Sequence, residues 1–340
     1  MSNPYQRQLS RHLASFGVQV QKSHSGEFFL KRALLQGKPD ILHIHWIHPF
    51  CTKQTFARSV INSFIFICEL AILRVLNVKI VWTVHNLKNH NNRYLQLDRL
   101  CTKIVAKLCH AIIAHCEKAK EEVISTFSLR DRQKVFVIGH GNYIGCYENK
   151  ISQTEARNTL GIAASKTVLL FLGLIRPYKG VLELVNAFDQ LANDEAMLMV
   201  AGKVWKDNLA QGELLKQKAA ANEQIQFIPE FVPDDKIQLY MNASDIVVFP
   251  YKDILTSGAV LLAMSFGKAC IAPRMGCIGE LLDDGGAFLY NPEDKDGLLR
   301  ATDASIAQKS KLADMGAHNQ AIAQQYDWES IAKLTSQVYR

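Results

Sequence analysis

The chain has 340 residues, of which 48% are hydrophobic and 21% are charged, and it carries a net charge of +7 at neutral pH. This composition excludes an intrinsically disordered chain and is typical of a globular protein. Because 340 residues exceed what one hydrophobic core usually supports, we expect two domains.

The positive charge is concentrated in the first part of the chain. Residues 1–150 hold 21 Lys and Arg against 9 Asp and Glu, a net of +12, and residues 151–340 hold 18 against 23, a net of −5. A basic first domain suits an anionic partner, such as a lipid diphosphate at an anionic membrane surface. Nucleic acid is disfavoured, because the sequence has no nucleic-acid motif and no basic stripe interleaved with aromatic residues.

The cysteines and the first residues bear on the compartment. No signal peptide is visible at Met1, and the eight cysteines show no Cys-x-x-Cys spacing. We therefore expect a cytoplasmic protein whose thiols are mostly buried and unreactive, and no structural zinc. A peripheral position at the inner face of the membrane is a further expectation.

Apolar runs and helix signals alternate along the first 140 residues, which predicts a doubly wound parallel sheet. Asn3 as a cap and Pro4 at the first helical position predict a helix over about residues 5–14, and a strand is expected at Val18–Gln21. Further strands are expected at Ile41–His45, Lys79–His85, Ala111–His115 and Lys134–Ile138, with helices near Tyr94–Lys107 and Lys118–Phe127.

The longest apolar stretch runs from Ser59 to Leu76 and is interrupted by Asn62, Glu69 and Arg74. It falls short of the roughly 20 apolar residues that span a bilayer, so a transmembrane helix is disfavoured. Two interpretations stay open: a buried helix of the first domain, and a partly exposed helix that docks on a membrane.

Ten of the eleven histidines lie in the first 140 residues, and several fall at predicted strand ends. The carboxyl ends of parallel strands face the ligand crevice of such sheets, so His45, His85, Asn86 and His90 are candidates to meet a sugar or an acceptor hydroxyl. A neutral imidazole near its unperturbed pKa can act as a general base. We assign that role to His85, with His90 in reserve.

The same histidines have two other interpretations. His43, His45 and His48 lie within six residues, which suggests zinc, but no acidic neighbour completes a ligand shell. We therefore expect no metal and assign His43 to packing.

The second half repeats the alternation after a polar linker at Glu148–Lys166. Strands are expected at Thr167–Leu172 and near Met197, Ile225, Ile246 and Cys270, and helices at Thr154–Leu160 and Val181–Leu191.

The segment Phe171–Gly180 places two cations and two glycines just past a predicted buried strand. Gly173 allows a close backbone approach, and Gly180 opens a helix, so the loop joins a strand end to a helix start, where α/β folds bind phosphate. Arg176 and Lys179 add positive charge. The alternative interpretation is a solvated basic loop.

A second strand-to-helix loop decides between these interpretations. In Leu255–Gly267, Thr256 or Ser257 can cap a helix, and Gly258 leaves the amides of the first turn open to a ligand. Two such sites, about eighty residues apart in one α/β unit, suit the two ends of a diphosphate.

With these loops the chain resembles nucleotide-sugar-dependent glycosyltransferases of GT-B fold, most closely glycosyltransferase family 4 and the inverting relatives that build bacterial exopolysaccharides. The resemblance implies two Rossmann-like α/β domains that face a central cleft: residues 1–150 on the acceptor side and 151–325 on the nucleotide-sugar side, with 326–340 as a helix that crosses back to the first domain. The resemblance also implies helices at Asp234–Met241 and Trp328–Tyr339. Such a first domain normally begins one strand earlier. Either the true start of the protein lies upstream, which we favour, or this domain tolerates the loss of a central strand. In that family a residue like His85 contacts the donor sugar. The implied donor contacts are Gly173, Arg176, Lys179, Gly180, Gly202, Lys203, Phe231, Val232, Thr256, Ser257, Gly258 and Ala259.

One departure from the family bears on stereochemistry. Retaining members carry two glutamates eight positions apart, and in the register set by Ala263-Met264 this chain has Ile254 and Leu262 there. Neither side chain can accept a hydrogen bond or stabilise a developing positive charge. We therefore favour an inverting reaction with a base from the first domain, and retention is the alternative if the register differs by one or two residues.

The sequence thus predicts a metal-independent hexosyltransferase without cofactor that uses a nucleoside diphosphate sugar and a lipid-linked saccharide. UDP-glucose is the favoured donor and GDP-mannose the next. The alternatives are an epimerase or hydrolase of nucleotide sugars and, from another class, a catalytically inactive nucleotide- or saccharide-binding protein.

Overall fold

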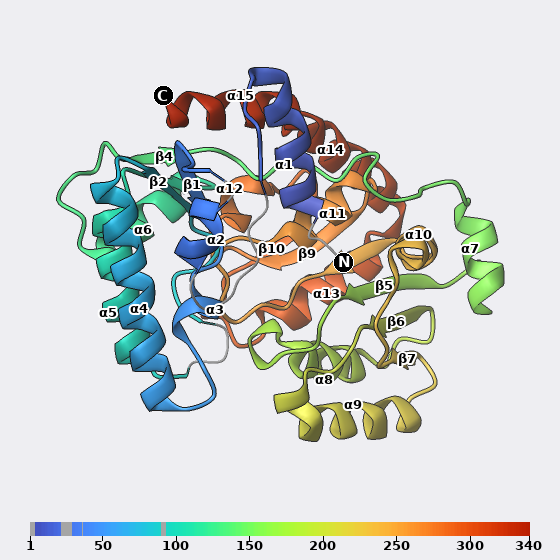
Figure 1. Cartoon of the computed structure of the whole chain (residues 1–340). Coiled ribbons are helices and arrows are strands. Elements are labelled where there is room, and N and C mark those ends of the chain that lie inside the picture. Colours follow the sequence, from blue (N-terminus) through green and yellow to red (C-terminus); the bar gives the residue numbers. More distant parts are fainter. Residues whose placement is uncertain (1–3, 22–28, 36, 90–92) are drawn as a thin grey trace. The chain divides into compact units, whose positions relative to one another are not determined.

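The computed structural model describes residues 4–21, 29–35, 37–89 and 93–340. They form two compact units, Met1–His140 with Trp328–Arg340, and Gly141–Asp327 (Figure 1). Each unit contains one parallel sheet with helices around it. The C-terminal helix α15 (Trp328–Tyr339) belongs to the first unit and packs on α1 (Pro4–Leu13).

The first unit has a four-stranded sheet in the order β1-β2-β3-β4, and all of its pairs are parallel. These strands confirm four sequence predictions: β1 (Ile41–Ile44), β2 (Lys79–Thr83), β3 (Ala111–Ala114) and β4 (Val135–Val137).

The predicted strand at Val18–Gln21 is wrong. The chain leaves α1 through a short 3₁₀ turn (Ala14–Phe16), Gly17 adopts a left-handed φ of 77°, and the Val18 N–H bonds back to the Leu13 carbonyl. Val18 packs against the α1 and α15 core instead of pairing with a strand.

Helices cover both faces of the first sheet. Val81, Ala111 and Ile113 pack against α1 and α15, whereas Trp82, on the opposite face of β2, stacks on Phe127 at 5.2 Å between ring centroids. The remaining helices of this unit are α2 (Phe29–Leu35), α3 (His48–Cys51), α4 (Phe56–Val75), α5 (Leu95–Leu108) and α6 (Glu117–Phe127).

The second unit has a six-stranded parallel sheet in the order β10-β9-β8-β5-β6-β7. Its strands are β5 (Thr167–Leu172), β6 (Ala196–Ala201), β7 (Ile225–Ile228), β8 (Ile246–Val248), β9 (Ala269–Pro273) and β10 (Ala287–Tyr290). The sequence predicted five of them and missed β10, a four-residue edge strand.

Strand β5 is buried on both faces, as its continuous apolar run predicts. Val168 and Leu170 face one core, and Leu169 and Phe171 face the other. The first core is completed by α7 (Gln153–Leu160), α10 (Ile237–Ala243), α11 (Gly258–Ser265) and α12 (Ile278–Leu281), and the second by α8 (Val181–Leu191), α9 (Leu209–Ala221) and α13 (Gly297–Ala307). Helix α14 (Leu312–Gln324) contributes to both.

A buried ion pair ties α7 to the sheet. The Arg157 guanidinium donates to the Asp245 carboxylate at 2.7 Å and to the carbonyls of Ala243 and Ala164, and the arginine side chain is only 7% exposed. The same carboxylate oxygen accepts from the Val168 N–H at 2.7 Å, at the start of β5. This network fixes where the central strand begins.

We predict that Arg157→Met destabilises the protein by about 3 kcal/mol or more, because it leaves a buried carboxylate without its charge partner. Urea unfolding followed by circular dichroism measures this loss. As a matched control, Arg132→Met removes an exposed ion pair with Glu121 and is expected to cost less than about 1 kcal/mol. Equal losses in the two variants would contradict the role given to Arg157.

Candidate functional site

The strand order of the second unit reverses between β5 and β8. From β5 the chain proceeds outward through β6 and β7, and from β8 it proceeds outward in the other direction through β9 and β10. In open α/β sheets, ligands bind outside the carboxyl ends of the strands at such a switch point. The loops after β5 and β8 are the two loops in which the sequence predicts diphosphate binding.

These two loops are held against each other by backbone contacts. The Lys252 N–H donates to the Tyr178 carbonyl at 2.8 Å. Gly180 has a left-handed φ of 65°, and a Cβ there would lie 1.8 Å from the Pro250 carbonyl oxygen. Only glycine therefore permits this approach at the start of α8.

The loop after β6 lies equally close to the loop after β5. A Cβ on Gly202 would lie 1.9 Å from the Gly173 carbonyl oxygen, and the Gly173 N–H donates to Ala201 at 3.0 Å. The Lys203 carbonyl accepts from the Ile175 N–H, while its side chain is exposed. Gly173, Gly202 and Lys203 are thus brought together as predicted donor residues.

Two cations of the first loop lie over this backbone. The Arg176 guanidinium stacks on the Trp205 ring at 4.0 Å from its centroid, which fixes its plane. The Lys179 ammonium approaches Gly173 so closely that a Cβ there would be 3.2 Å from Nζ. Among the described residues, neither cation forms an ion pair with a carboxylate.

The pKa of Lys179 reflects this position. Burial, and then the positive charge of Arg176, lower the pKa of the lysine from 10.5 to about 8. An anion bound beside both cations would offset these costs. The arrangement is therefore suited to hold negative charge.

Helix α11 begins on the other side of the switch point. Ser257 caps it, its hydroxyl accepting from the Val260 N–H at 3.4 Å, and the Tyr251 hydroxyl lies 3.3 Å from the same oxygen. Gly258 and Ala259 form the first turn, and Thr256 is half-buried just before the cap. The amino end of this helix adds a partial positive charge to the site.

Ile254 and Leu262 are half-buried and pack on the hydrophobic core of this unit. Phe231 and Val232 follow β7, and the Val232 side chain packs on that same core while Phe231 is exposed. Of these two donor contacts that the family resemblance implies, one side chain is thus anchored in the core and the other is an exposed ring.

In the first unit, three predicted strand-end histidines are joined by their rings. His45 Nδ1 lies 3.3 Å from His85 Nε2, His85 Nδ1 lies 3.3 Å from His115 Nε2, and His115 Nδ1 lies 2.9 Å from the Ile138 carbonyl oxygen. We call His45, His85 and His115 the histidine chain. His43 is separate, bonded to Tyr339 at 2.6 Å and to Thr83 at 2.8 Å.

The carbonyl of Ile138 sets the direction of every hydrogen bond in the histidine chain. A carbonyl only accepts, so His115 carries its proton on Nδ1 and, when neutral, accepts at Nε2 from His85. By the same logic His85 accepts from His45, and His45 keeps a lone pair on Nε2. Both nitrogens of His85 are therefore engaged, and its assignment as base stays a prediction.

All three rings are neutral at physiological pH. Burial lowers the pKa of His115 to about 4 against the raising effect of the Ile138 carbonyl. Burial, followed by the charges of neighbouring histidines, lowers the pKa values of His45 and His85 well below 6.5. The directional hydrogen-bond pattern is thus the state of the protein at neutral pH.

Asn86 takes part in a different network. Its side-chain amide lies 2.6 Å from His48 Nε2, and His48 Nδ1 lies 2.9 Å from the Asp98 carboxylate. The other Asp98 oxygen accepts from the Asn89 N–H. These bonds fix the loop after β2, and His90 lies outside the described residues.

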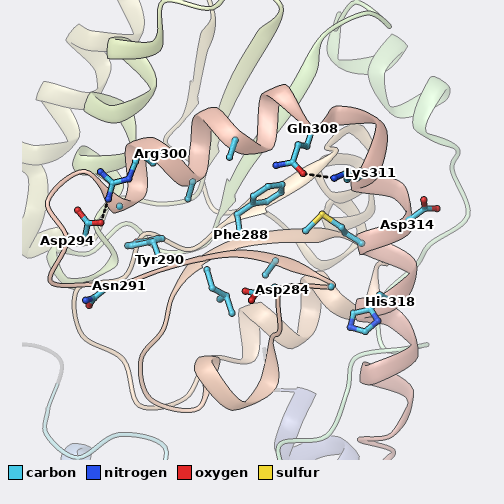
Figure 2. A pocket seen from close by; sticks show the side chains of 17 residues that line it. Asp284, Phe288, Tyr290, Asn291, Asp294, Arg300, Gln308, Lys311, Asp314 and His318 are labelled. Atoms are coloured by element: carbon cyan, nitrogen blue, oxygen red, sulfur yellow. Dashed lines mark hydrogen bonds and ion pairs between the residues drawn. The ribbon is translucent and has the colours of Figure 1, made fainter.

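A further cavity of the second unit lies away from these loops. About 950 Å³ in volume, it lies along edge strand β10 and α13, with Phe288 near its middle (Figure 2). Two of its cations already have partners: Arg300 pairs with Asp294, and Lys311 donates to the Gln308 side chain. Paired charges at a sheet edge, away from the switch point, do not suit a diphosphate.

Sequence reasoning missed three participants. His115 belongs to the histidine chain and Trp205 stacks on Arg176, but the sequence analysis assigned neither residue to a site. The available signal was their position at the end of a predicted strand or shortly after one. Tyr251 joins the α11 cap in the same way. Within the part of the chain that the structure describes, no group of three or more His, Cys, Asp or Glu side chains is arranged to hold a metal ion.

Comparison with known proteins identifies the class. The family described as Glycosyl transferases group 1 matches residues 152–322, and Glycosyltransferase Family 4 matches residues 19–141. The chain therefore belongs to glycosyl transferases group 1, and it is a glycosyltransferase of GT-B fold, which confirms the resemblance that the sequence indicates.

Individual relatives agree with this class. A GDP-mannose:glycolipid 4-beta-D-mannosyltransferase of Xanthomonas campestris pv. campestris is 25% identical over 99% of this chain and 88% of its own length. An alpha-maltose-1-phosphate synthase of Mycolicibacterium smegmatis is 25% identical over 72% of this chain and 66% of its own.

Two solved structures share the fold. Sucrose-phosphate synthase from Thermosynechococcus elongatus has a TM-score of 0.79 at 17% identity and covers 99% of this chain and 92% of its own. Anabaena HepE, solved in complex with UDP-glucose, has a TM-score of 0.72 at 19% identity and covers 96% and 86%.

We predict that the affinity for GDP and UDP falls as pH rises above about 8, because the Lys179 ammonium is lost as pH passes its pKa. The dissociation constant should rise by up to about tenfold per pH unit above that pKa. Calorimetric titration from pH 7 to pH 10 measures it.

The matched control is Lys179→Arg, which keeps its charge throughout this range and should give a flatter profile. Lys252→Gln, at an exposed lysine paired with Glu183, should keep the profile of the unmodified protein. An unchanged pH dependence in Lys179→Arg would refute the assignment of Lys179.

Proposed function

We propose that the protein transfers a hexose from a nucleoside diphosphate sugar to a saccharide carried on a lipid diphosphate, with inversion at the anomeric carbon and without a metal. The observation that carries the proposal is the pair of cations, Arg176 and Lys179, that lie without carboxylate partners among the described residues at the switch point. With the amino end of α11, they can neutralise a leaving diphosphate as a metal would in other enzymes.

For the donor we propose GDP-mannose ahead of UDP-glucose. The mannosyltransferase relatives match nearly the whole chain and most of their own length, and their names state GDP-mannose and a glycolipid. The likeness to HepE is at 19% identity and supports the fold rather than the donor. UDP-glucose, which the sequence favours, is the second donor to test.

Inversion is supported by the chemistry of the α11 region. Ile254 and Leu262 pack on the core and offer no carboxylate to stabilise a positively charged sugar from this side. The acceptor hydroxyl then attacks the anomeric carbon directly as the bond to the diphosphate breaks, and the diphosphate leaves with the electron pair. The names of the mannosyltransferase relatives state a β linkage, which is the product that inversion forms from an α-linked donor.

We propose His45, rather than His85, as the general base. Its Nε2 holds the lone pair at the end of the histidine chain and takes the proton of the attacking hydroxyl. The proton on His45 Nδ1 can then shift to His85, and that on His85 Nδ1 to His115, so that the positive charge reaches a ring bonded to the Ile138 carbonyl. His85 and His115 are positioning residues in this scheme.

We predict that GDP-mannose gives product with a panel of alkyl glycosides faster than UDP-glucose does, and that the product is β-linked. Nucleotide release measures turnover, and proton NMR of the product measures the anomeric configuration. An α-linked product from GDP-mannose would contradict inversion. Binding of nucleotide without any release would indicate a binding protein.

We predict that His45→Gln lowers kcat by about 10²-fold or more, the usual effect of losing a general base. Nucleotide affinity should be unchanged, because the diphosphate loops lie in the other unit. His115→Asn should lower kcat less and alter its pH profile, since it removes a ring that shares the charge. His318→Gln, an exposed histidine paired with Asp283, is the control. If His45→Gln stays within about threefold of the unmodified protein, the base lies elsewhere.

A further inference from the structure

Helix α4 presents a large apolar face to solvent. Phe56, Ile61, Phe64, Ile72 and Val75 are exposed, with Phe64 at 68% and Val75 at 82%. By length and composition α4 is also long and apolar enough to cross a membrane, although one such helix is weak support for spanning. A face of this kind on a soluble domain marks an interaction surface.

The buried side of α4 carries polar groups as well as apolar ones. Ser59, Ser63 and Glu69 are buried there beside Phe66, Leu70 and Leu73. Ser59 donates to the Thr55 carbonyl and accepts from the Lys53 N–H, and Glu69 accepts from the Leu30 N–H of α2. These polar groups are satisfied inside the unit, while a second set of large apolar side chains faces solvent, which an ordinary surface helix avoids.

Cations border the apolar face on both sides. At roughly 100° per residue, Ile61, Phe64 and Val75 fall within about 60° of one another around the helix axis. Arg58 and Arg74, both exposed, fall outside this arc on opposite sides. The face is an apolar strip with a positive residue along each edge.

The surroundings carry the same charge. Between Ile41 and His110 the sequence has nine Lys and Arg and only two carboxylates, Glu69 and Asp98. Both carboxylates are buried, whereas none of the nine cations is. Two of these cations, Arg99 and Lys107, are exposed on helix α5, which packs beside α4 (Figure 1). The surface charge of this segment is therefore entirely positive.

We propose that the exposed face of α4 is a docking surface for an anionic lipid bilayer, with Phe64 and its apolar neighbours in the acyl boundary and the flanking arginines among the headgroup phosphates. This inference rests on the lipid-linked acceptor of the proposed function. It adds two points to that function: which segment of the chain contacts the membrane, and that this segment prefers anionic lipids.

Two other roles of α4 fit the structure less well. A spanning helix would have to expose Ser59, Ser63 and Glu69 to lipid and break their hydrogen bonds. In a symmetric dimer the same patch meets itself, so the cationic borders of two copies would repel. An anionic bilayer satisfies both the apolar strip and its borders.

The test is co-sedimentation of the full chain with vesicles of phosphatidylcholine alone or with about one-third phosphatidylglycerol. We expect binding to the anionic vesicles only, weakened by added salt. The double variant Ile61→Gln/Phe64→Gln should lower the vesicle partition coefficient at least about tenfold, and Arg58→Gln about fivefold. Leu209→Gln, at a leucine of the second unit that is 65% exposed, is the matched control and should bind as the unmodified protein does.

Three results would overturn the proposal. The first is that the unmodified protein does not bind anionic vesicles, and the second is that the double variant binds them equally well. The third is a dimer in vesicle-free solution that dissociates in the double variant, which would assign the face to a second copy. Binding of GDP and UDP by every variant without vesicles separates this test from the proposed function. Vesicle binding without hexose transfer would support the docking surface and contradict only the proposed transfer of a hexose.

Discussion

The proposed diphosphate site depends on the distance between three backbone loops at the centre of the second sheet. Where the strand order reverses, the loop after β5 must pass the Pro250 carbonyl on one side and the loop after β6 on the other. Gly180 and Gly202 make this possible because each has a positive φ and no Cβ. The Arg157–Asp245 pair at the opposite end of β5 fixes the strand itself. The positions of Arg176 and Lys179 are consequences of this packing.

Two half-buried cations side by side lower the stability of the empty protein, and the lowered pKa of Lys179 is a sign of that cost. Such a cost is expected at a site that has to hold a charge which appears only when a ligand binds or a bond breaks. Trp205 limits the cost by stacking on Arg176, which orients the guanidinium without neutralising it. A carboxylate in its place would stabilise the fold and weaken the binding of the diphosphate that we propose for this site.

Much of the fold could be predicted, because its signals are local. The apolar run of β5 and the helical period of α8 give the bounds that the structure has. The predicted strand at Val18–Gln21 failed because Val18 packs on helices and Val20 is exposed, and β10 was missed because four residues carry little pattern. The glycine and cation positions of the phosphate loop are readable for the same local reason. The histidine chain is not, since its bonds join β-strand ends that lie 30 and 40 residues apart.

Composition alone does not decide the environment of helix α4. The sequence records an apolar segment with three polar interruptions, and two environments explain it equally well. The structure adds that the one acidic interruption, Glu69, is buried against α2 while the two basic flanks, Arg58 and Arg74, are exposed. Exposed Phe64 and Val75 cost solvation free energy in water. Docking on an anionic bilayer, as we propose, would recover that cost, because the bilayer interface is itself partly apolar.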